Sequence, residues 1–262
     1  MSIHDWRPAL GGAGVLLLAT IPASAYAEPI STDRPDFVES SLVVGAGRFQ
    51  VETSVAHQND QASGFKSQTL SSPTLLRLGL GDVLEARLET DGYKRDHVDG
   101  ESAVTGWSEI ALGVKWHTSD ADWLGASSAV LVHVDIPSGA SEFRGKELRP
   151  SLRYVAEWAP ADRWSVGVMP GVIWNTDDAG DRYTAALIGA TAGYAWTDTF
   201  RTFAELASED IGGGDRAPTQ VRFDTGFALL LSQDVQLDAA AYAGLNRDTP
   251  DLQVALGLSI RW

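Results

Sequence analysis

The chain has 262 residues, no cysteine and a formal net charge of -15 at pH 7. The lack of cysteine excludes disulfides, cysteine-ligated zinc and thiol catalysis. The strong acidity argues against nucleic acid as a partner, because its phosphates would be repelled. A chain of this length can form one barrel or two small domains.

The first 27 residues are typical of an export signal. A positive charge precedes an uncharged stretch over residues 8–27, and Ala25 and Ala27 supply the small residues that favour cleavage before Glu28. Residues 1–27 are therefore predicted to be a signal peptide. A retained membrane anchor is the alternative, although several glycines and a proline weaken such a helix.

Residues 28–46 form a polar segment ahead of the first expected strand. Pro35 cannot donate a hydrogen bond to a strand ladder, so the segment is expected to be an ordered, extended piece inside or beneath a barrel. In that position Arg34 could pair with carboxylates of the lumen. A disordered periplasmic tail is the alternative. The motif residues of this segment are Asp33, Arg34, Pro35 and Asp36.

Residues 47–262 are predicted to form one all-β transmembrane barrel of twelve antiparallel strands. Apolar and polar residues alternate along each stretch, and the stretches suit membrane-crossing strands of about 9–11 residues. The expected strands are residues 47–57, 68–80, 83–93, 105–117, 125–136, 147–159, 163–175, 183–196, 199–207, 218–231, 234–246 and 251–262. Their short turns carry a recurring aspartate, at Asp82, Asp122, Asp162, Asp198 and Asp234.

Short turns alternate with longer polar loops, a pattern that is typical of barrels with periplasmic turns and extracellular loops. Tryptophans cluster beside the short turns and at the terminus, as expected for a ring of aromatic side chains at the headgroups of a bacterial outer membrane. They are Trp116, Trp123, Trp158, Trp164, Trp196 and Trp262. The last strand, with alternate apolar residues from Leu252 to Trp262, resembles the signal read by the barrel-assembly machinery. We therefore expect two partners, outer-membrane lipid and that machinery.

The face of the strands that would point into the lumen carries ten acidic and eight basic residues. This balance fits either a self-satisfying network or polar steps that guide a small-molecule solute. Strands seven and eight are instead apolar on this face, which fits either a path for a hydrophobic solute or packing of residues 28–46 there. The candidate lumen residues are Arg87, Glu109, Lys115, Arg153, Glu157, Gly171, Gly189, Arg222 and Asp224.

Catalytic and metal-binding patterns are weak. The four histidines after residue 27 do not stand in nucleophile or zinc spacing, so no catalytic residue, metal or cofactor is expected. His133 and Asp135 share a strand face near an outer loop and are the best candidate pair for an outer-membrane hydrolase, which we keep as a third alternative.

Several motifs resemble an outer-membrane transporter family associated with the meta-pathway of phenol degradation. They are TDRPDFVES at residues 32–40, GRFQVE at 47–52, LGVKW at 112–116 and IPSG at 136–139. The resemblance implies a barrel that imports small, often aromatic compounds, although this chain ends on Trp262 where such barrels usually end on Phe. We expect a channel for passive uptake of a small aromatic or hydrophobic solute. A structural or surface-interaction barrel with a closed lumen is the alternative.

Overall fold

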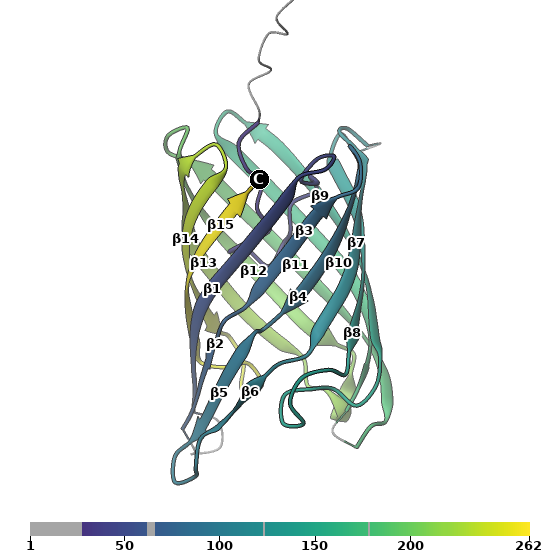
Figure 1. Ribbon diagram of the computed structural model, residues 1–262, viewed down its shortest axis with the longest axis vertical. Coiled ribbons are helices and arrows are strands. Elements are labelled where there is room, and N and C mark those ends of the chain that lie inside the picture. The colour runs from purple at the N-terminus through teal and green to yellow at the C-terminus, as the bar shows by residue number, and fades with distance from the viewer. Residues whose placement is uncertain (1–27, 62–65, 123, 178) are drawn as a thin grey trace, which may run out of the picture.

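The protein folds as one closed antiparallel β-barrel (Figure 1). A computed structural model describes residues 28–61, 66–122, 124–177 and 179–262, so the expected signal peptide lies outside the described residues. Its strand segments form one sheet, and the last segment pairs with the first to close the barrel. Within these ranges, no helix is long and apolar enough to cross a membrane.

Fifteen strand segments make up the sheet. They are β1 (Phe49–Asp60), β2 (Ser67–Ser71), β3 (Thr74–Gly79), β4 (Leu84–Thr90), β5 (Tyr93–Val98), β6 (Val104–Trp107), β7 (Ile110–Ser119), β8 (Ser127–Ile136), β9 (Arg149–Ala161), β10 (Trp164–Thr176), β11 (Arg182–Ala195), β12 (Phe200–Ile211), β13 (Gln220–Ser232), β14 (Val235–Gly244) and β15 (Leu252–Arg261). Three interrupted strands account for the difference from twelve: β2 with β3, β4 with β5, and β6 with β7. The predicted twelve-stranded barrel is confirmed.

The prediction of one loop is partly wrong. Residues 94–104 were expected to be irregular, but β5 continues to Val98 and pairs with β2 and β6. This extension projects beyond the other strands at the end of the barrel opposite the C terminus (Figure 1). Its residues Lys94, Arg95, Asp96 and His97 show no apolar alternation, so the sequence pattern that marks membrane strands is missing there.

The strand faces are inverted relative to those of a soluble protein. Along β15, Leu252, Val254 and Leu256 are exposed, whereas Ser259 and Arg261 are buried toward the lumen. The register with β1 pairs residue after residue from one end of the seam to the other. Closure matters because an unpaired strand edge in lipid would leave backbone groups without hydrogen bonds.

Exposed aromatic side chains mark both ends of the barrel. Trp116, Trp196 and Trp262 are exposed at the end where the short turns lie, whereas Trp123 lies outside the described residues. Tyr93 and Trp107 pack edge to face at the opposite end, where β5 meets β6. Two girdles of aromatic residues, separated by an apolar wall, are typical of an outer-membrane barrel.

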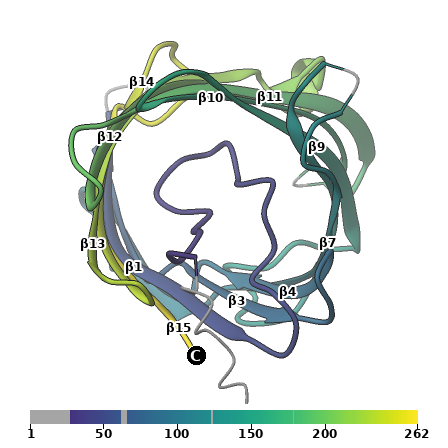
Figure 2. The same cartoon turned by 90° about the horizontal axis from the view of Figure 1, so that it is seen from above.

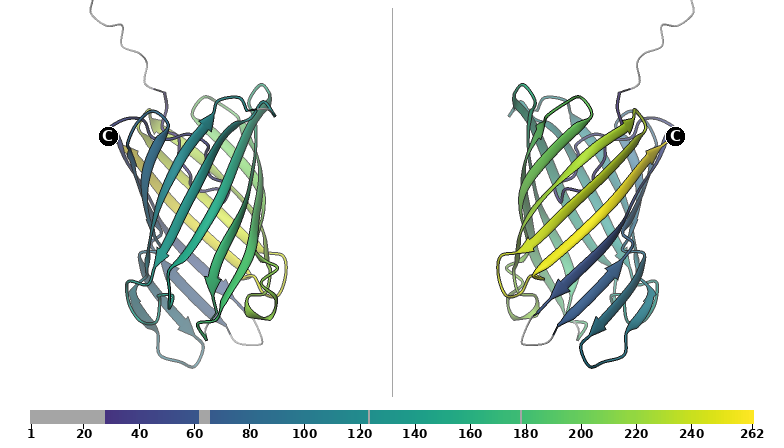
Figure 3. Two further views of the ribbon diagram at one scale, coloured as in Figure 1. Left: turned by 90° about the vertical axis from the view of Figure 1, so that its right-hand side faces the viewer. Right: turned by 90° about the vertical axis from the view of Figure 1, so that its left-hand side faces the viewer.

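The segment formed by residues 28–46, which we call the N-terminal segment, lies inside the barrel (Figure 2). It enters at the rim that holds the C terminus (Figure 3) and returns to β1 through a tight turn. Gly45 and Gly47 have φ values of +88° and +69° in this turn, a conformation that favours glycine. The turn packs closely on Gly79, where a Cβ atom would stand 1.7 Å from the Gly45 carbonyl oxygen.

Candidate functional site

Lumen carboxylates hold the backbone of the N-terminal segment. An extended segment without strand partners needs other acceptors for its N–H groups, and four inward-facing glutamates supply them. The backbone N–H groups of Asp33 and Arg34 donate to Glu52 (2.9 and 3.0 Å), those of Phe37 and Val38 to Glu205 (2.7 and 2.8 Å), that of Ser41 to Glu157 (2.6 Å) and that of Val44 to Glu85 (3.0 Å). The barrel wall thus takes the place of a neighbouring strand.

Asp33 is the ionic centre of the N-terminal segment. Its carboxylate oxygens lie 2.8 Å from Lys115 Nζ, 2.6 Å from Arg87 Nη1 and 3.4 Å from Arg77 Nη1. Burial alone would raise the pKa of Asp33, but Arg77, Lys115 and Arg87 outweigh it and hold that pKa well below its usual range. The carboxylate therefore stays ionised and binds three strands of the wall, β3, β4 and β7, to the segment.

The expectation that Arg34 would pair with lumen carboxylates is wrong. Its guanidinium Nη2 donates to Ser54 Oγ at 2.6 Å. The acidic neighbours of Arg34 in the motif make the ion pairs instead, since Asp36 lies 3.6 Å from Arg201 and Asp33 contacts the lysine and arginines described above. The ion pairs of the motif therefore join carboxylates of the segment to cations of the wall.

A second carboxylate of the segment, Glu39, continues the network. It lies 2.7 Å from Arg87 Nη2 and 3.0 Å from Arg153 Nη1. Arg77 is fully buried between Glu52 and Glu85, with contacts of 2.9 and 2.8 Å. Buried charges are tolerated when they are paired and hydrogen-bonded, so this network favours one position of the segment.

Apolar contacts fix the other side of the N-terminal segment. Val38 packs in a buried cluster with Ala129, Leu131, Val155 and Met169 of the wall. Of the two small residues singled out on strands seven and eight, Gly189 is covered by Phe37 and Val38, since a Cβ atom there would meet each at 2.7 Å. Gly171 instead faces Leu187 and Arg153. The segment therefore packs on the part of the apolar wall around Gly189 but not on Gly171.

A cavity of about 620 Å³ lies next to the N-terminal segment. Residues 33–37 and Glu39 line it from the segment, and Phe143, Thr249 and Pro250 line it from the longer loops, so it faces the loop end of the barrel. Four predicted lumen residues line it as well, Arg87, Glu109, Arg153 and Arg222. The volume is in the range of small-molecule sites.

The other predicted lumen residues do not line this cavity. Lys115 is buried against Asp33, and Glu157 accepts the Ser41 N–H. Asp224 is fully buried and accepts a hydrogen bond from Arg222 Nε at 2.9 Å. Lys115 and Glu157 therefore hold the segment, and Asp224 holds Arg222.

Arg222 joins the barrel wall to the aromatic part of the cavity. Its guanidinium carbon stands 4.8 Å from the ring centre of Phe37 and 5.8 Å from that of Tyr242. Glu209 and Asp224 pair with the same side chain at 3.0 and 2.9 Å. The cation therefore neutralises carboxylates while its flat face contacts both rings.

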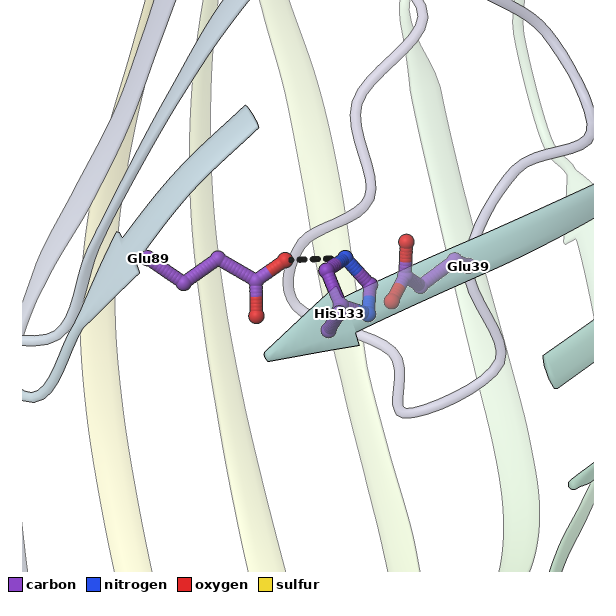
Figure 4. A group of neighbouring side chains, drawn as sticks. All are labelled: Glu39, Glu89 and His133. Atoms are coloured by element: carbon purple, nitrogen blue, oxygen red, sulfur yellow. Dashed lines mark ion pairs between the residues drawn. The ribbon is translucent and has the colours of Figure 1, made fainter. Parts of the chain in front are cut away.

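The candidate catalytic pair is not assembled. His133 Nε2 lies 3.0 Å from Glu89 (Figure 4), whereas Asp135 lies 3.2 Å from Arg149. Glu39, Glu89 and His133 could together offer three metal ligands, but Arg87 Nη2 already lies 2.7 and 2.9 Å from the two carboxylates. The guanidinium supplies the positive charge that a metal ion would bring.

Glu52, Glu85 and Glu205 are among the ten acidic residues expected on the inward face, but the sequence does not indicate that they accept hydrogen bonds from the N-terminal segment. One signal was available for Glu205. It stands directly opposite Asp224 on the neighbouring strand, and like charges in that position are destabilising unless other groups compensate. Two facing carboxylates predict donors from elsewhere, and the segment provides them.

The closed barrel, with its apolar outer face and its two girdles of aromatic residues, defines the class of this protein as an outer-membrane β-barrel. Residues 32–262 match the sequence profile of a family described as "Putative MetA-pathway of phenol degradation". The chain belongs to this family, which confirms the resemblance found in its motifs.

Solved structures of outer-membrane barrels are similar in fold. An outer-membrane channel from Pseudomonas putida F1 has 14% sequence identity and a TM-score of 0.69, with 85% of this chain and 98% of that chain covered. The KdgM porin, solved in complex with disordered oligogalacturonate, has 8% identity and a TM-score of 0.51, with coverage of 80% and 98%. The β domain of the Bordetella autotransporter BrkA has 11% identity and a TM-score of 0.50, with coverage of 82% and 98%. A comparison with curated proteins found no match.

Proposed function

We propose that this protein is a passive outer-membrane channel for a small solute, with the N-terminal segment as a displaceable plug. The observation that carries the proposal is the cavity of about 620 Å³ that faces the loop end and is lined by the segment itself. A solute that enters from outside reaches a chamber of suitable size and then meets the segment. Passage requires the segment to shift.

The way in which the segment is held supports such a shift. Most of its contacts are hydrogen bonds and ion pairs to the wall, which water can replace when the segment moves. Its apolar anchoring in the buried cluster is limited to Val38 with Phe37 packed against it, while Ile30 and Val44 are buried elsewhere. Similarity in fold to an outer-membrane channel of Pseudomonas putida F1 also supports the assignment.

The solute that we propose is small and aromatic or hydrophobic. Support comes from the family description, which refers to phenol degradation, and from Phe37 and Tyr242, whose side chains line the cavity. The lining also carries many polar groups, so a solute with both an apolar body and a polar group fits better than a pure hydrocarbon.

A reversible crosslink tests the proposal. Ser41 Oγ of the segment lies 2.7 Å from Ser127 Oγ of β8, and the chain contains no cysteine, so Ser41→Cys with Ser127→Cys would create a single possible disulfide. In liposome-swelling assays with phenol, the oxidised double variant should be closed and the reduced form open. The swelling rate of the Ser41→Cys single variant should be the same with and without the oxidant.

The runner-up is a structural or surface-interaction barrel whose lumen stays closed. The dense contacts around Asp33 favour this alternative, because they hold the segment against three strands. Swelling and bilayer conductance would be measured for the wild type, the reduced double variant and a variant that lacks residues 28–46. If none of the three shows either activity, the closed barrel is favoured and the channel is rejected.

A further inference from the structure

The cavity lining is divided into a charged wall and an uncharged wall. The charged wall is formed by residues of β4, β8 and β9 and by Glu109, and its charges are already paired. Arg149 pairs with Glu109, and Arg153 pairs with Glu39 at 3.0 Å. An anionic or cationic solute at this wall would have to break an existing ion pair.

The uncharged wall lies on three consecutive strands, β1, β15 and β14. Gln58 stands directly opposite Gln253, and Gln253 stands directly opposite Tyr242, so the three side chains share the inner face. Opposite residues on one face have Cβ atoms about 4.5–5.5 Å apart. All three side chains line the cavity together with the apolar Leu75.

The two glutamine amides are free hydrogen-bonding groups that stand side by side in the cavity. Tyr242 donates its hydroxyl proton to the Pro35 carbonyl at 2.9 Å. Within the described part of the chain, neither the Gln58 nor the Gln253 side chain forms a hydrogen bond or an ion pair. Each amide offers both donors and an acceptor, which is the combination that a hydroxyl group can satisfy without any net charge.

We propose that Gln58 and Gln253 form the polar subsite for a neutral, hydroxyl-bearing solute, with its apolar body against Leu75 and Phe37. This inference rests on the proposed channel and specifies the solute class. Charge balance favours a neutral ligand over an anion, because the lining contains seven acidic residues and six basic ones in a chain of net charge -15.

An organic anion is the competing ligand. Arg34 lines the cavity, and among the described residues no carboxylate lies within ion-pair distance of it. If the solute were an aromatic acid, Arg34 would be its partner and the glutamines would matter little. The two ligand classes can therefore be distinguished by separate variants.

Equilibrium binding to the detergent-solubilised full-length barrel tests the inference independently of transport. Titration calorimetry would use phenol, cyclohexanol and benzoate with the wild type, the Gln58→Leu/Gln253→Leu double variant and an Arg34→Met variant. Gln68→Leu, an exposed position of β2 outside the cavity lining, is the matched control. Loss of two neutral hydrogen bonds should weaken phenol and cyclohexanol binding about tenfold or more in the double variant and leave the control unchanged.

Several results would overturn the subsite. They are benzoate binding more tightly than phenol with dependence on Arg34, unchanged phenol affinity in the folded double variant, or no binding of either neutral solute. Heat-modifiable migration on gels reports folding. If the double variant does not fold, the phenol affinities of the single variants Gln58→Met and Gln253→Met are measured in its place. Swelling without neutral-solute binding would reject only this subsite, whereas binding without any swelling would reject the channel.

Discussion

Glu205 and Asp224 face each other across neighbouring strands, with both carboxylates directed into the lumen. The two carboxyl groups find their partners on different sides. Arg222 pairs with Asp224, and the backbone N–H groups of Phe37 and Val38 donate to Glu205. The N-terminal segment therefore supplies hydrogen-bond donors to a carboxyl group that the barrel wall places opposite another one.

Removing the acceptor should release the segment. In Glu205→Leu, the N–H groups of Phe37 and Val38 lose their partners, at a cost of about 1–3 kcal/mol each while they remain buried. We expect a higher open probability in planar bilayers. Glu205→Gln keeps one acceptor oxygen and is the matched control, with a much smaller effect. Equal conductance of wild type and the leucine variant would show that Glu205 does not hold the segment.

Asp33 should govern the acid stability of the closed state. Asp33→Asn leaves Lys115, Arg87 and Arg77 without their shared anion, and we expect a loss of about 3–5 kcal/mol at pH 7. The pKa of Asp33 is lowered in the folded protein because the three cations outweigh the effect of burial. The ionised form is therefore the stabilising one.

Its contribution is complete above the unfolded-state pKa of about 4 and falls by about 1.4 kcal/mol per pH unit below it. Urea unfolding of wild type and Asp33→Asn in lipid vesicles, followed by tryptophan fluorescence, should give a constant difference from pH 7 to about pH 4 and a shrinking one below. A difference that grows on acidification would contradict this assignment.

A bulkier residue at Gly189 should open the channel. A Cβ atom at this position would stand 2.7 Å from both Phe37 and Val38, so Gly189→Leu has no room while the segment is in place. We expect higher conductance and faster cleavage of residues 28–46 by added protease. Gly81→Ala, where nothing lies within 4 Å of the new Cβ, should behave as wild type. Reduced conductance in the leucine variant would instead place the solute path along Gly189.

The terminal aromatic residue should control assembly. Trp262 stacks on Phe49 across the barrel seam, with ring centres 6.0 Å apart, and its backbone exchanges two hydrogen bonds with Phe49. Trp262→Ala should reduce the heat-modifiable fraction recovered from outer membranes several-fold, whereas Trp262→Phe should retain it. If alanine assembles as well as tryptophan, recognition by the assembly machinery does not depend on this ring.

Much of the barrel could be predicted because its determinants are local. The alternating residues of β15 and the aspartate turns fix strand positions and which face meets lipid. β5 was missed beyond Tyr93 because both faces of the extension carry polar residues, and its pairing with β2 is non-local.

The lumen was harder to predict because its partners lie far apart in the chain. The small residues Gly171 and Gly189 indicated close approach, but the same pattern fits a solute path or the N-terminal segment. The roles within the motif depended on the path of the backbone, so Asp33 rather than Arg34 became the centre of the ion pairs.

The turn that contains Gly45 and Gly47 has a consequence for the order of assembly. The N-terminal segment enters and leaves at the same rim, where Ile30 N–H donates to the Gln233 carbonyl and the chain then turns into β1. It is a folded-back flap and does not thread through the barrel. Because the segment enters and leaves at one rim, neither closing the strands before it is in place nor removing it afterwards requires any strand pairing of the seam to break.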